Sequence, residues 1–240
     1  MSFTLWRGVV GMVRPTRRPG TLEELIRMLP EGIGIVPLLL NFKSGSIEEF
    51  RQSIPQYERY VAELAEQGAD LIIASGAPPF MLLGPEAEAK LTRQWEKKYK
   101  TRIVTDPQMQ VAGLRAMKIK KFIGASYSAL QNKIVLDYMT QAGLKAVSMQ
   151  PIDVPFDQVA QISTQTLYAH IKRLFRNHRG ADGIYIQGGG WQTARVVPML
   201  ETDLQVPVVH ATVCQAWQIH KCLSVRETVP GYGRLLAELP

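Results

Sequence analysis

The chain has 240 residues, of which 46% are hydrophobic and 20% are charged, and this composition excludes a disordered or fibrous protein. It predicts one or two compact domains. Two cysteines, Cys214 and Cys222, are too few for a disulfide framework. The N-terminus lacks a secretory leader pattern, and no run approaches the roughly 18 apolar residues of a membrane helix. We therefore expect a cytoplasmic protein without a membrane partner.

A formal net charge of +7 raises the question of a nucleic-acid partner. The basic residues fall into separate clusters: Arg14, Arg17 and Arg18; Lys97, Lys98, Lys100 and Arg102; Lys118, Lys120 and Lys121. No cluster is interleaved with aromatic side chains, as a stacking platform for bases would be. A basic surface that attracts small acidic substrates explains the same charge. We expect no nucleic-acid partner.

Short apolar runs alternate with amphipathic stretches along the chain. The eight runs are Gly8–Val13, Gly34–Leu40, Leu71–Ala74, Arg102–Thr105, Lys121–Ala125, Lys145–Met149, Gly183–Ile186 and Val206–His210. Between them, Ser46–Gln67 and Pro85–Lys100 have helical spacing, and Gly68 is placed to end the first of these helices. Strands that alternate with helices and are apolar along their whole length predict parallel sheets covered on both faces.

The sequence also repeats itself. Ala-Asp-Leu-Ile-Ile-Ala-Ser-Gly at 69–76 returns as Ala-Asp-Gly-Ile-Tyr-Ile-Gln-Gly at 181–188, and two further segments recur in the same order about 110 residues on. The repeat predicts an α/β fold of two pseudo-symmetric flavodoxin-like halves, each a four-stranded parallel sheet. We expect the first domain at 1–115 plus 220–240 and the second at 116–219. Ligands bind beyond the carboxyl ends of such strands, so the site is expected between the halves.

Three stretches at those strand ends carry a family resemblance. They are Ser-Gly-Ala-Pro-Pro-Phe-Met-Leu-Leu-Gly at 75–84, Gly-Ala-Ser-Tyr at 124–127 with Asn132 beyond it, and Asp-Gly-Ile-Tyr-Ile-Gln-Gly-Gly-Gly-Trp-Gln-Thr at 182–193. Together with Pro207-Val-Val and Trp217, they resemble the aspartate/glutamate racemase superfamily. Within it they are most similar to the arylmalonate decarboxylase and maleate isomerase families.

The resemblance implies cofactor-free chemistry at a carbon beside a carboxylate, with an enediolate stabilised by backbone and hydroxyl donors. It also implies that Tyr127 approaches the substrate carboxylate. The two cysteine positions of the superfamily align with Gly76 and Gly188 here, and Ala77 and Pro78 stand where the decarboxylase has hydroxyl residues. Because Pro78 has no backbone N–H to donate, that carboxylate contact is lost as well. The acid or base must therefore be a group other than the superfamily cysteine.

Further substrate-binding candidates lie near the predicted strand ends. The backbone around Gly76–Ala77 and Gly188–Gly189 is expected to hold a carboxylate or a developing oxyanion, with Pro78 beside it, whereas the alternative for the glycines at 188 and 189 is a tight turn alone. Arg14 with Pro15 ends the first strand, where a guanidinium can hold a carboxylate through two parallel bonds. The remaining candidates are Asn41 in a loop over the cleft, Asn132, which is equally suited to capping a helix, and Gln187, which can orient a carbonyl group.

Three residues are candidates for proton transfer. His210 ends the last strand and is expected to face the cleft, and imidazole titrates near neutral pH. Cys214 lies near a helix start, where a thiol can acidify, although a core cysteine is the plainer interpretation. Asp106 follows the fourth strand and suits a base, but Asp-Pro is equally typical of a turn. We predict His210 and Tyr127 as the catalytic pair.

Phosphate-loop, nucleophile-elbow and dinucleotide-binding patterns are missing, so we expect no cofactor and no metal. The sequence predicts a cofactor-independent lyase or isomerase that forms an enediolate-type intermediate on a small carboxylate or cyclic imide, in the manner of arylmalonate decarboxylase. A hydrolase on the same scaffold, or a catalytically silent protein that binds a small molecule, is the alternative. The oligomeric state is open, although a closed homo-oligomer is the usual expectation for a soluble enzyme.

Overall fold

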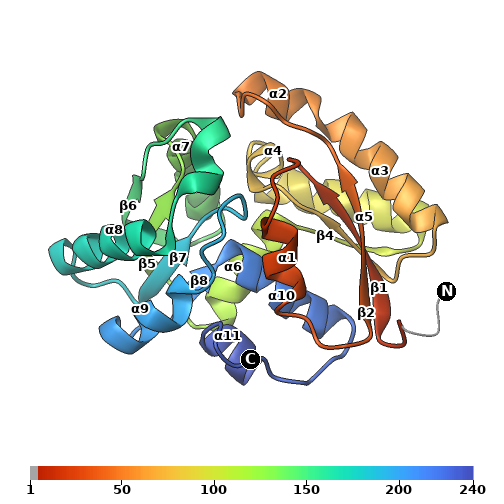
Figure 1. The fold of residues 1–240 in the computed structure, drawn as a ribbon. Helices are drawn as coiled ribbons and strands as arrows, with labels where there is room; N and C mark the ends of the chain where they lie inside the picture. Colours follow the sequence, from red (N-terminus) through yellow and green to blue (C-terminus); the bar gives the residue numbers. More distant parts are fainter. Residues whose placement is uncertain (1–4, 240) are drawn as a thin grey trace.

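The computed structural model describes residues 5–239 and contains two separate four-stranded parallel sheets (Figure 1). Residues 1–4 and 240, which fall in the predicted first domain, lie outside the described residues. The strand order is β2-β1-β3-β4 in one sheet and β6-β5-β7-β8 in the other. The strands are β1 (Gly8–Arg14), β2 (Ile33–Leu39), β3 (Leu71–Ala74), β4 (Arg102–Thr105), β5 (Lys121–Ser126), β6 (Lys145–Pro151), β7 (Gly183–Ile186) and β8 (Val208–His210). The prediction of two flavodoxin-like halves is confirmed.

Helices surround both sheets. They are α1 (Thr21–Ile26), α2 (Ile47–Gln52), α3 (Ile54–Glu66), α4 (Ala77–Met81), α5 (Pro85–Tyr99), α6 (Asp106–Ala116), α7 (Ala129–Gln141), α8 (Thr164–Asn177), α9 (Val196–Leu204), α10 (Ala211–Cys222) and α11 (Arg234–Glu238), with a 3₁₀ turn η1 at Phe156–Gln161. None of the helices within residues 5–239 has the length and apolar character needed to cross a membrane.

The aspartate of the repeated Ala-Asp pair makes an equivalent hydrogen bond in each half. Asp70, just before β3, accepts a hydrogen bond from the backbone N–H of Val9 at 2.7 Å. Asp182, just before β7, accepts from the backbone N–H of Lys121 at 2.9 Å. Each carboxylate thus ties the start of its strand to the neighbouring strand, β1 or β5. Since β3 and β7 are buried along their whole length, this link fixes two apolar strands at the centre of each sheet.

The single helix predicted over Ser46–Gln67 is wrong, because the structure divides it into α2 and α3 at Ser53. Pro55 lies in the first turn of α3. Its ring nitrogen has no hydrogen to donate to the preceding turn, so one helix ends and the next begins there. Ser46 caps α2 as expected of a serine at this position, accepting a hydrogen bond from the N–H of Glu49.

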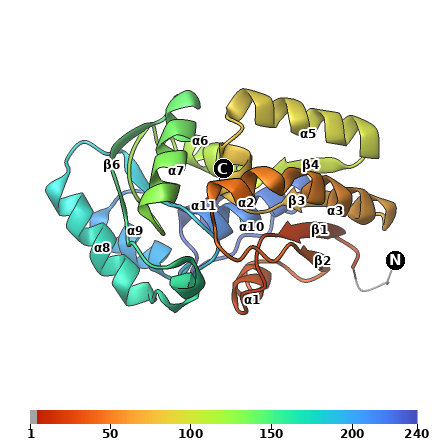
Figure 2. The same ribbon diagram turned by 90° about the horizontal axis from the view of Figure 1, so that it is seen from above.

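The two halves are joined by α6 and α10, which follow the last strand of each sheet and pack against each other. Figures 1 and 2 both show these helices between the sheets. The C-terminal segment contacts both halves. Arg7 in the first half pairs with Glu227 at 2.7 Å, whereas the N–H of Arg234 donates to Glu201 of α9 and α11 packs on β8. The division of the chain into the two predicted domains stays a prediction.

Candidate active site

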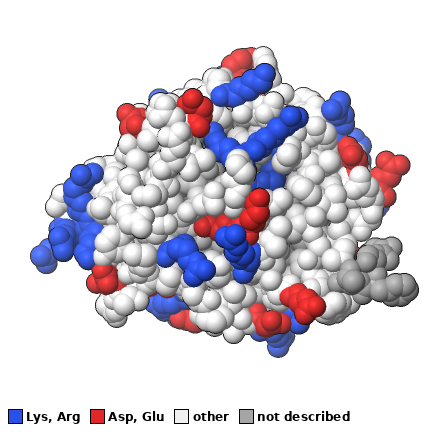
Figure 3. All heavy atoms as spheres, in the orientation of Figure 1, with Lys and Arg blue, Asp and Glu red and all other residues white. Residues whose placement is uncertain are grey.

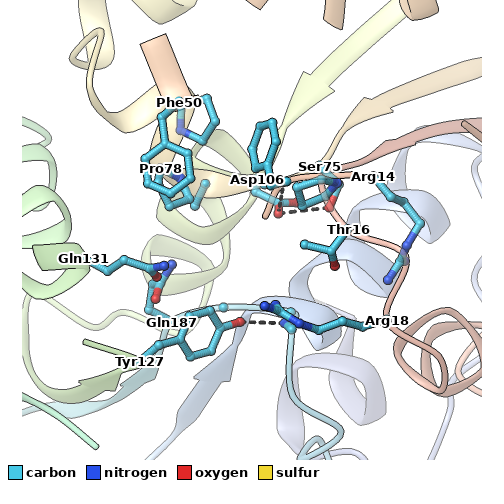
Figure 4. Close-up of a pocket in the computed structure, with 18 of the residues that line it drawn as sticks. Arg14, Thr16, Arg18, Phe50, Ser75, Pro78, Asp106, Tyr127, Gln131 and Gln187 are labelled. Carbon is cyan, nitrogen blue, oxygen red and sulfur yellow. Dashed lines mark hydrogen bonds between the residues drawn. The ribbon is translucent and has the colours of Figure 1, made fainter. Parts of the chain in front are cut away.

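A pocket of about 610 Å³, open solvent at its mouth included, lies between the halves at the carboxyl ends of the strands (Figure 4). Its lining comes from both halves and comprises Arg14, Pro15, Thr16, Arg18, Phe42, Phe50, Ser75, Gly76, Ala77, Pro78, Pro79, Asp106, Tyr127, Gln131, Phe156, Gln187, Gly188, Gly189, Gly190 and Gln215. The pocket is therefore at the place that the repeat predicts.

Asp106, the first residue of α6, is the acidic residue of the pocket wall and is only 4% exposed. One carboxylate oxygen accepts from the N–H of Gly76 at 2.7 Å and from the hydroxyl of Ser75 at 3.1 Å. The other accepts from the side-chain amide of Gln215, on α10, at 2.8 Å. Burial raises the pKa of Asp106, while these donors and the positive charge of Arg14 act in the opposite direction. The result is a buried carboxyl group held in a fixed orientation beside the pocket.

Gly76 and Gly188 occupy equivalent places after β3 and β7, and both have a positive φ, of 109° and 103°. Tyrosine side chains fill the space beside them. A Cβ atom at Gly76 would lie 2.6 Å from the hydroxyl of Tyr57, and one at Gly188 would lie 2.7 Å from Cε1 of Tyr127 and closer still to its hydroxyl. Real Cβ atoms do not approach other atoms so closely. A side chain at either of the two positions that align with the superfamily cysteines would therefore require the neighbouring tyrosine to move.

Tyr127 directly follows β5, and its ring packs edge-on against Trp191 with centroids 4.6 Å apart. Its hydroxyl oxygen accepts from the N–H of Gly190 at 2.5 Å. Within residues 5–239 the hydroxyl hydrogen has no acceptor, and the N–H groups of Gly188 and Gly189 have no protein acceptor either. Burial raises the pKa of Tyr127, so the hydroxyl stays protonated and can donate. Three donors are thus free beside one part of the pocket.

Two glutamines and two arginines make two further sides of the pocket polar. Figure 4 shows Gln131 and Gln187 on the side formed by the second half, with Arg14 and Arg18 across the pocket from them. The side-chain oxygens of both glutamines are buried without a partner among the described residues. Figure 3 shows Lys and Arg side chains gathered in the upper middle of the face, where the two halves meet. The remaining wall is apolar, with the rings of Phe42, Phe50 and Phe156 and three prolines.

The structure brings most of the predicted site residues together. The predicted residues that line the pocket are Arg14, Pro15, Gly76, Ala77, Pro78, Tyr127, Gln187, Gly188 and Gly189. Asn41 and Asn132 do not line it. Asn132 instead accepts from the hydroxyl of Ser126 and donates to the carbonyl of Met149, each at 2.9 Å, so it ties the end of β5 to β6. Asn41 has a positive φ of 70° in the turn after β2, and its neighbour Phe42 lines the pocket.

His210 and Cys214 are both fully buried away from the pocket lining. The expectation that His210 faces the cleft is therefore corrected. The side chain caps α10, with one ring nitrogen accepting from the N–H of Thr212 and the other contacting the hydroxyl of Thr193, each at 3.1 Å. Burial lowers the pKa of His210 to about 3 and raises that of the Cys214 thiol. His210 thus caps the helix that follows its strand.

Sequence reasoning did not single out Ser75, Gln131 or Gln215 as pocket residues. Gln131 and Gln215 are each one position from a predicted candidate, Asn132 and Cys214, and the rotation of α7 and α10 decides which of the two neighbours faces the pocket. Thr16 and Arg18 were also missed, although Arg18 belongs to a basic cluster. Among the described residues no group of three or more His, Cys, Asp or Glu side chains is arranged to hold a metal ion.

Comparison with known proteins agrees with this fold. The family model of arylmalonate decarboxylase matches residues 10–236. Arylmalonate decarboxylase of Bordetella bronchiseptica is 23% identical over 232 residues, which cover 95% of this chain and 96% of the relative. A mutant of arylmalonate decarboxylase, solved in its liganded form, superposes with a TM-score of 0.89 at 22% identity, with coverage of 96% of this chain and 99% of that one.

The maleate isomerase Iso of Pseudomonas putida S16 superposes with a TM-score of 0.88 at 20% identity and covers 97% of this chain and 99% of its own. At these identities the solved structures establish the fold. The match of the family model over nearly the whole chain confirms the resemblance drawn from the sequence, and with it the prediction of an enzyme from the decarboxylase and isomerase group. The chain belongs to the arylmalonate decarboxylase family.

Proposed function

We propose that this chain is a cofactor-independent lyase or isomerase that forms an enediolate-type intermediate on a small carboxylate, and that Asp106 moves the proton. The observation that carries the proposal is the buried Asp106 carboxyl at the wall of a pocket that also holds three free donors. Glycine occupies both positions that align with the superfamily cysteines, 76 and 188, and His210 lies outside the pocket. Asp106 is the group of the lining whose chemistry suits proton transfer at a carbon atom.

Two features support the stabilisation of an enediolate. The hydroxyl of Tyr127 and the amides of Gly188 and Gly189 lie together and lack protein acceptors among the described residues. Donors fixed in advance around a developing negative charge contribute strongly to catalysis, about 2.7–4 kcal/mol for each donor removed in a well-studied oxyanion hole. These three donors would hold the carboxylate whose α-carbon reacts, and the charge that develops on it.

Burial suits Asp106 for its proposed role, because it raises the pKa of the carboxyl group, and a carboxyl group with a raised pKa is protonated more readily and is the better acid. In a decarboxylation the bond to the leaving carboxylate breaks, carbon dioxide departs, and the electron pair enters the enediolate. Asp106 then gives its proton to the α-carbon and regains one from solvent. In an isomerisation the same carboxyl group would remove a proton from the substrate carbon and return it.

The test is proton NMR in deuterated buffer with arylmalonates, maleate, hydantoins and amino-acid enantiomers. We expect deuterium at the carbon beside a carboxylate or carbonyl for at least one of these, and we expect Asp106→Asn to reduce its rate at least about 100-fold. Asp137→Asn, on the exposed face of α7, is the matched control and should retain the full rate. Thermal melts establish that both variants fold.

Other results would contradict the proposal. Full turnover by Asp106→Asn would exclude this carboxyl group as the proton donor. Incorporation of labelled solvent oxygen into the product would identify a hydrolase. Tight ligand binding without exchange or product across the whole panel would identify a binding protein.

A further inference from the structure

Arg14 and Arg18 lie on one side of the pocket, and among the described residues neither has a carboxylate within 4.0 Å (Figure 4). Arg14 ends β1, and Arg18 lies in the loop that leads to α1. The pairing of a guanidinium with an acidic group is the usual way to bury its charge, because this side chain does not give up its proton in proteins. Two guanidinium groups without such a partner at one pocket indicate an anionic ligand.

Arg14 provides the stronger evidence, because it is only 7% exposed. Its two terminal nitrogens donate to neutral atoms, the sulfur of Met12 at 3.4 Å and the hydroxyl of Thr21. Neither atom neutralises the positive charge. Burial lowers the pKa of Arg14, and the negative charges of Asp106 and Glu23, which make no ion pair with it, act in the opposite direction. The acid on the pocket wall, Asp106, already accepts hydrogen bonds from three donors.

Arg18 reaches from the first half to the second. Its guanidinium stacks on the ring of Phe156, with 4.3 Å to the ring centroid, and donates to the carbonyl of the same residue. Its other terminal nitrogen lies beside the glycine loop, since a Cβ atom at Gly190 would be 3.0 Å from it. Stacking on an aromatic ring fixes the orientation of the planar group while leaving its edge free to donate. Arg18 is thus held in place beside the pocket, and no carboxylate of residues 5–239 lies within 4.0 Å of it.

We propose that Arg14 and Arg18 form a second anion subsite, which binds an acidic group of the substrate away from its reacting carbon. The proposal rests on the proposed function, in which Tyr127 and the amides of Gly188 and Gly189 hold the reacting carboxylate. A planar carboxylate matches the paired N–H donors of a guanidinium. The substrate class is accordingly an aliphatic acid with two or more carboxylates on different carbons, whose chain crosses the pocket against the prolines and phenylalanines of its apolar wall.

The test is calorimetric binding of two matched series that needs no turnover. Succinate, glutarate and adipate are compared with butyrate, valerate and hexanoate, which have the same carbon counts and one carboxylate fewer. We expect at least one dicarboxylate to bind about tenfold or more tighter than its partner. In Arg18→Gln this preference should fall below about threefold, with the affinity for the monocarboxylate retained. Arg14→Gln should act in the same direction.

Arg17→Gln is the matched control, because it removes the same charge from an exposed neighbour outside the pocket lining, and it should keep the preference. If Arg14→Gln fails to fold, Arg18→Gln decides the matter alone, since Arg18 is only half-buried. Equal affinity for both series in the unmodified protein would overturn the proposal. So would a preference that survives in Arg18→Gln, or one that Arg17→Gln also removes.

Binding of malonate, whose two carboxylates share one carbon, tests which carboxylate the arginines hold. If it binds as tightly as the best longer dicarboxylate, the arginines hold a carboxylate of the reacting carbon, and the proposed second subsite is overturned. A dicarboxylate preference without exchange in the NMR assay would support the subsite and contradict the proposed function. Exchange with no dicarboxylate preference would do the reverse, so the two failures can be told apart.

Discussion

Substitution of Gly188 by alanine tests whether the space beside β7 is closed to a side chain. The φ of Gly188 is 103°, where a residue with a Cβ atom is strained by about 1–3 kcal/mol. The new methyl group would also overlap the ring of Tyr127, with Cε1 only 2.7 Å away. The ring has to move, which breaks the hydrogen bond from the N–H of Gly190, worth about 1 kcal/mol. The sum predicts a loss of about 2–4 kcal/mol in the free energy of unfolding.

Urea unfolding of Gly188→Ala measures this free energy, and thermal melting should show a fall in Tm of about 4–16 °C for a chain of this length. Gly189→Ala is the matched control. A Cβ atom there would meet no atom closer than the hydroxyl oxygen of Thr212 at 3.5 Å, so we expect a change below about 1 kcal/mol. Equal stability of Gly188→Ala and the unmodified protein, or equal destabilisation by both substitutions, would refute the reasoning.

The same geometry predicts the outcome of restoring a cysteine. Gly188→Cys carries the same Cβ atom, so Tyr127 must leave its position before a thiol can enter the pocket. Tyr127→Phe does not remove the overlap, because the ring carbons lie close as well as the hydroxyl. We therefore expect Gly188→Cys to lose stability with or without Tyr127→Phe.

Three further predictions concern other parts of the chain. Burial raises the pKa of Glu88 to about 7 from an ordinary 4.5, so its contribution to the free energy of unfolding is full below pH 4.5 and is lost as the pH rises through 7. In urea unfolding, the free energy should therefore fall less between pH 5 and pH 8 for Glu88→Gln than for the unmodified protein, by at most about 3 kcal/mol. Tyr127→Phe should lower kcat of the exchange reaction at least about tenfold while the protein stays folded, and an unchanged kcat would exclude its hydroxyl as a donor. Ser128 caps α7 by accepting from the N–H of Gln131, so Ser128→Ala should cost about 1 kcal/mol in urea unfolding, whereas no loss would mean that the cap contributes nothing.

The sequence determined the eight strands and their division into two sheets. Apolar runs such as Leu71–Ala74 and Gly183–Ile186 are buried on both faces, and their apolar composition predicts this burial. The repeat placed Gly76 and Gly188 at equivalent strand ends, so the position of the pocket followed from parallel strand direction. The prediction of a single helix over Ser46–Gln67 was wrong because Pro55 interrupts the backbone hydrogen bonds there, although the helical spacing of apolar residues is continuous.

Tertiary structure decided which side chains face the pocket. Gln131 and Gln215 line it, while their neighbours Asn132 and Cys214 do not, because consecutive residues of a helix point about 100° apart and packing sets the rotation. His210 lies at a strand end as predicted, yet its ring nitrogen accepts a hydrogen bond from the N–H of Thr212 at the start of α10. The orientation of Asp106 likewise depends on residues far away in the chain, since Gly76 and Gln215 donate hydrogen bonds to its buried carboxyl group. Local sequence fixes the elements, whereas burial and pairing of polar groups exist only once the two halves have packed together.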